Sequence, residues 1–95
     1  MTHDVVAHHL HIRGRVQGVA FRASMVAQAR SLGVAGWVRN REDGSVEALV
    51  QGKPADVKHI IAWAHQGPPR ASVSGVDATP VACQPLSGFR QRATA

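Results

Sequence analysis

The apolar residues of this chain repeat with two different periods, and the order in which the periods alternate limits the folds open to it. In residues 7–13, Leu10 and Ile12 alternate with polar neighbours, which predicts a strand with one apolar face. From residue 21 the spacing changes to that of a helix, which Gly33 ends. The apolar stripe of this helix consists of Phe21, Met25, Ala29 and Leu32.

Three further segments read as strands. Residues 34–40 and 45–51 predict two strands joined by a turn that contains an Asp-Gly pair, a common hairpin signal. Residues 73–79 predict a fourth strand, and residues 87–92 could form a short fifth.

A second amphipathic helix is predicted between the third and fourth strands. Gly52 and Pro54 open it, because proline is tolerated in a first turn, and the Gly-Pro-Pro of residues 67–69 stops it. Its stripe consists of Val57, Ile60, Ile61 and Ala64. The order βαββαβ predicts a ferredoxin-like α+β sandwich, with two helices on one face of an antiparallel sheet. Right-handed crossovers give the strand order 4-1-3-2.

The chain has 95 residues, which we expect to form a single domain over residues 1–95 with its core in about 7–92. Residues 1–6 and 93–95 read as loose ends. The start, Met1-Thr2-His3-Asp4, lacks the features of a signal peptide, and no apolar run approaches a membrane span. We expect a cytoplasmic monomer that does not bind a membrane.

Eleven Lys and Arg against six Asp and Glu give a net charge of +5, which favours anionic partners. An RNA-binding module of this fold presents aromatic side chains on its open sheet face. This chain has no Tyr and two Phe, and Phe21 is already assigned to a helix, so nucleic acid is not the expected partner. A metallochaperone of this topology needs paired thiols, and the chain has one Cys.

The segment Gly14-Arg15-Val16-Gln17-Gly18-Val19-Ala20-Phe21-Arg22 carries glycines directly into the start of a helix. The first N–H groups of a helix lack internal partners, and the helix dipole adds positive charge there. Such a junction binds anions readily, and consecutive loop amides can form a concave nest around phosphate oxygens. Arg22 lies in the first turn, where its planar fork can grip two phosphate oxygens.

A second feature is Gly36-Trp37-Val38-Arg39-Asn40, followed by Asp43-Gly44-Ser45-Val46-Glu47. Asn40 ends the second predicted strand and shares the parity of Val38, which places it on the helix-covered face. The end of this strand and the loop after the first strand can come close in the predicted fold. Asn40 would then reach a phosphate held at the loop. The alternative is that Asn40 is only a turn former before the hairpin.

Together these two motifs strongly resemble the acylphosphatase family, over about residues 7–92. The resemblance implies hydrolysis of small acyl phosphates, with Arg22 binding the phosphate and Asn40 positioning the attacking water. It implies that loop amides complete the phosphate site and that no cofactor or metal is needed. The implied amide residues are Arg15, Val16, Gln17, Gly18, Val19, Ala20 and Phe21.

Two positions depart from the family pattern. Ala20 stands where the most familiar motif has Gly, and a methyl group is costly there only if the residue needs a positive φ, which we do not expect. The aromatic-rich C-terminal strand of the family is reduced to Phe89. Acylphosphatase-like domains also occur inside larger carbamoyl-transfer proteins, whereas this one is expected to stand alone.

The residue types in the two motifs suit a carboxylate leaving group, which needs no proton donor. Neither Arg nor Asn titrates near neutral pH, and the loop motif holds no Asp, Glu, His or Cys. A phosphate monoester expels an alkoxide that needs a proton donor or a metal, whereas an acyl phosphate expels a carboxylate that leaves unaided. Positioning and charge stabilisation then suffice, which predicts a metal-independent hydrolase that releases a carboxylate and inorganic phosphate.

The histidines do not predict a metal site. His9 and His11 share one strand face while His8 lies on the other, so only two of the three can converge. His59 and His65 are six residues apart, so a helix does not present them on one face for binding a metal.

Overall fold

The computed structural model describes residues 4–95 and contains five strands and two helices. They are β1 (Val6–Arg15), α1 (Phe21–Leu32), β2 (Ala35–Asn40), β3 (Val46–Gly52), α2 (Pro54–Ala64), β4 (Ser72–Val81) and β5 (Phe89–Gln91). The predicted order βαββαβ is confirmed, and the short fifth strand is present. No helix of residues 4–95 has the length and apolar character to cross a membrane.

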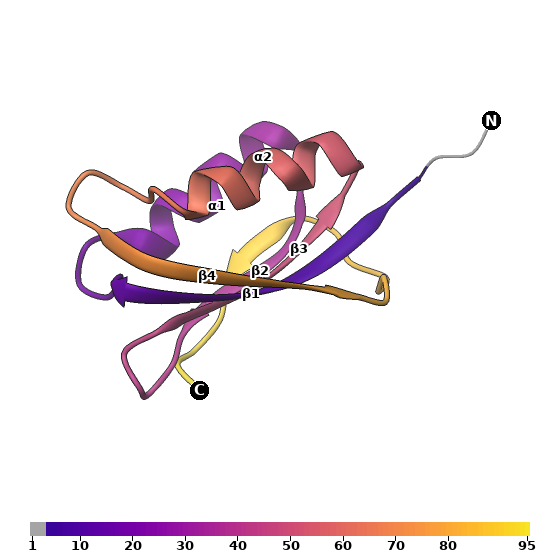
Figure 1. Ribbon diagram of the computed structural model, residues 1–95. Coiled ribbons are helices and arrows are strands. Elements are labelled where there is room, and N and C mark those ends of the chain that lie inside the picture. Colours follow the sequence, from indigo (N-terminus) through magenta and orange to yellow (C-terminus); the bar gives the residue numbers. More distant parts are fainter. Residues whose placement is uncertain (1–3) are drawn as a thin grey trace.

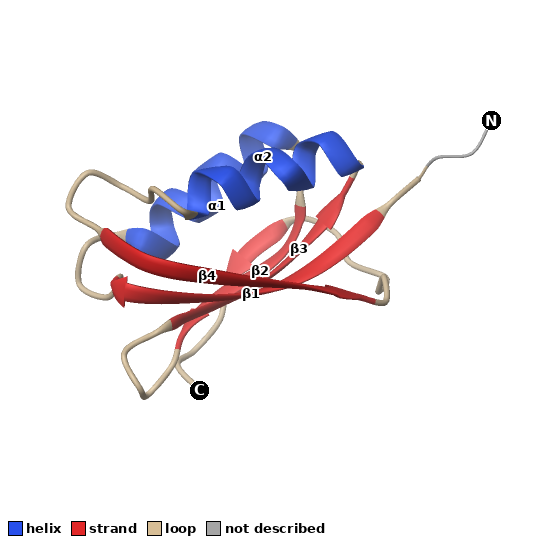
Figure 2. Ribbon diagram, in the orientation of Figure 1, coloured by secondary structure: helices blue, strands red, loops and turns tan. Residues whose placement is uncertain are grey.

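The strands form one sheet in the order β4-β1-β3-β2-β5. The first four are antiparallel in the predicted order, and β5 adds to the outer edge of β2 in parallel. Both helices cover the same face of the sheet and leave the other face open (Figures 1 and 2). The expected two-layer α+β sandwich is confirmed, with a mixed sheet because of β5.

The core lies between the helices and the covered sheet face. Strand alternation buries Leu10 and Ile12, and the helical stripes bury their members except Leu32 and Ile61, which are partly buried. The fully buried side chains of largest volume are Phe21, Phe89, Leu10, Ile12, Met25, Ile60, Val16, Val38, Val46, Val50 and Val57. Burial of each Val, Leu, Ile, Phe or Met contributes about 1.5–3 kcal/mol, so this layer fixes α1 on the sheet.

The first strand is longer than the sequence predicted. It continues through Gly14 to Arg15, with a bulge in its pairing to β4 between Arg13 and Gly14. Gly14 has a φ of 121°, and a Cβ there would lie 2.2 Å from the carbonyl oxygen of Ser72. Glycine is therefore required at the bulge, and the loop that leads into α1 is confined to residues 16–20.

The chain ends are more ordered than predicted where they are described. Val6 belongs to β1, and the backbone N–H of Ala95 donates to the carbonyl oxygen of Asn40 at 3.1 Å. The carbonyl oxygen of Ala95 accepts from the N–H of Glu42 at 3.0 Å. The expectation of a loose segment at 93–95 is wrong because this backbone pairs with the end of β2, and residues 1–3 lie outside the described residues.

Candidate active site

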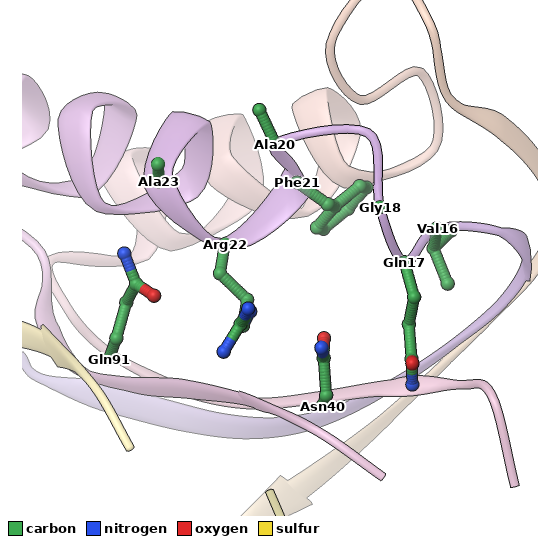
Figure 3. A pocket seen from close by; sticks show the side chains of 9 residues that line it. All are labelled: Val16, Gln17, Gly18, Ala20, Phe21, Arg22, Ala23, Asn40 and Gln91. Atoms are coloured by element: carbon green, nitrogen blue, oxygen red, sulfur yellow. The ribbon is translucent and has the colours of Figure 1, made fainter. Parts of the chain in front are cut away.

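A cavity of about 130 Å³ lies where the 16–20 loop meets the first turn of α1 and the ends of β2 and β5 (Figure 3). It is lined by Val16, Gln17, Gly18, Ala20, Phe21, Arg22, Ala23, Asn40 and Gln91. The volume is well below the roughly 300–1,000 Å³ of pockets for drug-sized ligands. The cavity therefore suits a small ligand, and it brings together the predicted pair Arg22 and Asn40.

Arg22 and Asn40 reach the cavity from opposite layers. Arg22 points down from α1 and Asn40 points up from the end of β2, so that the two side chains face each other (Figure 3). Asn40 pairs with Val46 in the sheet and is half-buried. The parity argument correctly placed Asn40 on the helix-covered face.

The start of α1 lacks negative charge of its own. No acidic residue lies in its first turn, and no side chain caps its free N–H groups. Among residues 4–95 the guanidinium of Arg22 makes no ion pair or hydrogen bond with another side chain or with the backbone. Arg22 therefore adds a cation to the positive end of the helix dipole, an unfavourable arrangement that an anion in the cavity relieves.

The loop backbone is left-handed at two separate residues before the helix begins. Gly18 has a φ of 73° and Ala20 a φ of 63°, whereas Val19 between them is not left-handed. Alternating conformations of this kind turn successive N–H groups toward one side and form anion-binding concavities. The expectation that Ala20 avoids a positive φ is wrong.

Ala20 is the N-cap of α1, and its carbonyl oxygen accepts the helical hydrogen bond from the N–H of Ser24 at 3.0 Å. Its left-handed backbone differs from the extended conformation that is usual at an N-cap. Its methyl group points away from the cavity (Figure 3). The alanine therefore costs backbone strain, about 1–2 kcal/mol for a left-handed L-residue, and does not crowd the ligand.

The remaining loop residues hold the backbone in place. Val16, Val19 and Phe21 are buried in the core, and the ring of Phe21 packs against Trp63 with centroids 5.3 Å apart. Arg15 is exposed at the end of β1, opposite Ser72. Arg15 and Val19 do not line the cavity, unlike the other predicted amide residues.

The side chain of Gln17 ties the loop to the β2–β3 turn. Its Nε2 donates to the carbonyl oxygens of Arg41 at 2.7 Å and Ser45 at 2.9 Å. The sequence predicted a role for the backbone amide of Gln17 and none for its side chain. This link fixes the loop beside the residue that follows Asn40.

Glu47 braces the same hairpin from the open face of the sheet. Its carboxylate accepts from Arg39 Nε at 2.6 Å, from His9 Nε2 at 2.6 Å and from Arg41 Nη1 at 3.2 Å. Burial raises the pKa of Glu47, but the hydrogen bonds and charges of His9 and Arg39 outweigh it and lower the pKa from 4.5 to about 2. The two arginines that flank Asn40 are thus held by a carboxylate that stays ionised.

Other side chains of the open face are also engaged. His11 Nε2 lies 2.9 Å from Ser45 Oγ, and Trp37 is buried beneath the guanidinium groups of Arg39 and Arg92, at 4.8 and 4.7 Å from its ring. Trp37 therefore serves as a packing residue of the open sheet face. Within residues 4–95, no three His, Cys, Asp or Glu side chains gather in a way that could hold a metal ion.

The lining residues that were not predicted from the sequence are Ala23, next to Arg22 on α1, and Gln91. Gln91 lies on β5, two residues after the buried Phe89, and faces the same side of the sheet. The apolar Phe89 was the available signal, because a residue two positions along a strand shares its face.

Comparisons with known proteins agree with this geometry. The acylphosphatase family model matches residues 8–91. The acylphosphatase of Azoarcus sp. (strain BH72) is 58% identical over 80 residues, which cover 84% of this chain and 82% of that protein. The acylphosphatase of Thermococcus kodakarensis is 55% identical over 82 residues, 86% of this chain and 90% of the relative.

A solved structure extends the agreement to three dimensions. The structure of an acylphosphatase from Coxiella burnetii superposes with a TM-score of 0.91 at 35% identity, over 94% of each chain. The resemblance that the two sequence motifs carry is thereby confirmed over nearly the whole chain. The chain belongs to the acylphosphatase family, whose members hydrolyse acyl phosphates.

Proposed function

We propose that this enzyme cleaves the carboxyl–phosphate bond of small acyl phosphates without a metal, with Arg22 and the loop amides holding the phosphate and Asn40 orienting the water. The carrying observation is that Arg22 and Asn40 face each other across a small cavity at the start of α1 (Figure 3). Because no acidic side chain lines that cavity, a phosphate entering it meets only positive or neutral groups.

The phosphate is held by charge and by backbone geometry. The proposed donors are the guanidinium of Arg22 and the amides of the loop and first turn, which have no acidic side chain competing for them. Residues 15–21 contribute these amides. Arg22 and the helix end supply the charge neutralisation that a metal provides in other phosphoryl-transfer enzymes.

Asn40 directs the nucleophile. Its carboxamide accepts a hydrogen bond from water through Oδ1 and donates one through Nδ2. The water oxygen attacks phosphorus, the bond from phosphorus to the carboxyl oxygen breaks, and the carboxylate leaves with the bonding electron pair. The water proton passes to a phosphate oxygen of the substrate. Among residues 4–95, no side chain that lines the cavity is a general acid, which restricts the reaction to leaving groups that depart unprotonated.

The proposal also covers the domain organisation, location and partners of the chain. Residues 1–95 act as one cytoplasmic, monomeric domain with no nucleic-acid partner. The open sheet face supports the last point, because Trp37 is buried beneath Arg39 and Arg92 and offers no stacking surface. A gel shift at moderate salt checks it, since attraction by scattered basic charge fades with salt.

Hydrolysis of benzoyl phosphate beside that of a phosphate monoester, both with chelator present, tests the function. Rapid loss of benzoyl phosphate and none of the monoester is expected. Equal hydrolysis of the two, or activity that chelator removes, contradicts the proposal.

A further inference from the structure

The cavity has two ends, and the phosphate-binding groups lie at only one of them. In Figure 3, the loop residues Val16 and Gln17 lie on one side of Arg22, and Gln91 lies on the other. Gln91 points up from β5 toward Ala23 on α1. Its position is fixed by the pairing of Gln91 with Val38 of β2 and by the burial of Phe89.

The carboxamide of Gln91 is available to a ligand. Within residues 4–95, two other glutamines use their carboxamides inside the protein: Gln17 binds the β2–β3 turn, and Gln51 exchanges two hydrogen bonds with the backbone of Gln84. The hydrogen bonds of this part of the chain include none from the Gln91 side chain, which is exposed at the cavity. Gln91 thus presents an unused donor and an unused acceptor beside Arg22.

In-line displacement decides which part of the substrate reaches Gln91. The attacking and leaving oxygens lie on opposite sides of the phosphorus in phosphoryl transfer. If Asn40 holds the water, the leaving carboxylate lies on the far side of the phosphate. Figure 3 places Asn40 on one side of Arg22 and Gln91 on the other. With the phosphate bound by the guanidinium of Arg22, as proposed above, the leaving group is directed toward Gln91.

We propose that Gln91 and Ala23 form the acyl subsite and that Gln91 Nε2 donates a hydrogen bond to the leaving carboxylate. This inference rests on the proposed function. Negative charge grows on the acyl oxygens as the bond to phosphorus breaks, so the hydrogen bond strengthens in the transition state and no proton is transferred. Leaving groups of high basicity gain most, and the small cavity favours compact acyl groups.

A leaving-group series tests this role of Gln91. Acetyl phosphate and a set of substituted benzoyl phosphates are compared in wild type, in Gln91→Leu, which keeps the size but removes the donor, and in Gln91→Glu, which replaces the donor with an anion. Gln66→Leu is the matched control, since Gln66 is exposed in the turn after α2 and away from the cavity.

We expect Gln91→Leu to lower kcat/KM for acetyl phosphate about tenfold and for nitrobenzoyl phosphate about two- to threefold, so that the plot of log kcat/KM against leaving-group pKa steepens. Gln91→Glu steepens it further. Gln66→Leu leaves the plot unchanged. Inhibition by inorganic phosphate stays within about twofold of wild type in Gln66→Leu and Gln91→Leu, because Arg22 and the loop amides bind the phosphate, whereas the added anion of Gln91→Glu repels phosphate.

Three outcomes overturn the inference: an unchanged slope in both Gln91 variants, an equal loss for all substrates, or weaker inhibition of the uncharged variant Gln91→Leu by phosphate, which would place Gln91 on the phosphate. Failure of the proposed function looks different. In that case the wild-type enzyme and Gln66→Leu also fail to hydrolyse the acyl phosphates.

Discussion

The carboxamide Nε2 of Gln17 donates to the carbonyl oxygen of Ser45 at 2.9 Å and so joins two segments that are far apart in the sequence. The same atom donates to Arg41 at 2.7 Å. Gln17 belongs to the loop before α1, and Ser45 precedes β3. The two sides of the cavity are therefore connected directly, in addition to their attachment through the core.

Replacement of Gln17 by Leu removes this connection while keeping the bulk of the side chain. Two hydrogen bonds of about 1 kcal/mol each are lost, so the unfolding free energy falls by about 1–2 kcal/mol. Inhibition by inorganic phosphate weakens several-fold because the loop amides are less well placed. Urea unfolding and phosphate inhibition measure the two effects. A loss of stability with unchanged phosphate inhibition would show that the link does not position the loop.

Arg22→Ala is expected to weaken the binding of inorganic phosphate about 10- to 100-fold, the range for losing a charge-assisted hydrogen bond, and to lower turnover as well. Arg22→Lys keeps the charge and loses the planar fork, so it recovers only part of the affinity. Isothermal titration calorimetry with phosphate measures both. Arg70→Ala is the control, because Arg70 is exposed outside the cavity. Phosphate affinity in Arg22→Ala equal to that of the control is incompatible with the proposed role.

Asn40→Ala is expected to abolish most turnover, lowering kcat at least about a hundredfold, because misplacement of the nucleophile carries costs of that order. The affinity for inorganic phosphate stays within about threefold of wild type, since Arg22 and the loop are intact. Steady-state hydrolysis of benzoyl phosphate and phosphate titration separate the two effects. Near-normal hydrolysis by Asn40→Ala would remove the water-orienting role.

Ala20→Gly is expected to raise the unfolding free energy by about 0.5–1 kcal/mol. Glycine adopts the left-handed conformation of this N-cap without strain, and the gain exceeds the extra backbone entropy that glycine brings to the unfolded chain. Hydrolysis stays near wild type because the methyl group points away from the cavity (Figure 3). Urea unfolding measures the change. A less stable variant would mean that residue 20 does not need a positive φ in solution.

Glu47 makes the free energy of unfolding depend on pH in the acid range. Its pKa is about 2 in the folded protein against 4.5 for the free side chain, so folding favours the carboxylate. The contribution, on the order of 3 kcal/mol, is fully present above about pH 4.5 and is lost as the pH falls toward 2.

Glu47→Gln is expected to be less stable at neutral pH and to lose less stability than wild type between pH 4.5 and 2. Urea unfolding at a series of pH values checks this expectation. Asp43 keeps its hydrogen bond from Ser45, and Asp77 keeps its ion pair with Arg13, in both proteins. These two exposed carboxylates therefore contribute equally to the two curves. Parallel curves for the two proteins would show that Glu47 is not the acid-sensitive group.

The parts of the fold that were predictable are those that local rules determine. Helical and alternating periods located the helices and strands, and the handedness of crossovers ordered the four antiparallel strands. Asn40 was placed correctly because the parity of a strand fixes which face a residue occupies. Arg22 was placed correctly beside the loop because it belongs to the first turn of α1, and the loop leads directly into that turn.

The parts that were missed depend on distant contacts. The alanine at position 20 does not itself indicate a left-handed backbone, since alanine favours the right-handed helix; the glycine of the family motif at this position was the available signal. The side-chain bonds of Gln17 end on carbonyl oxygens of a turn beyond β2. Gln91 reaches the cavity only because burial of Phe89 docks β5 beside β2, a pairing that three residues do not encode by themselves.

The uncompensated positive end of α1 has a thermodynamic consequence for the enzyme as a whole. A protein that places an arginine and a helix N-terminus at one cavity gains stability from an anion bound there, and one-site linkage gives about 2.7 kcal/mol at a hundredfold excess over the dissociation constant. Inorganic phosphate, the product, would then protect the native state between turnovers, so that resistance to denaturation and residual product inhibition share a single origin.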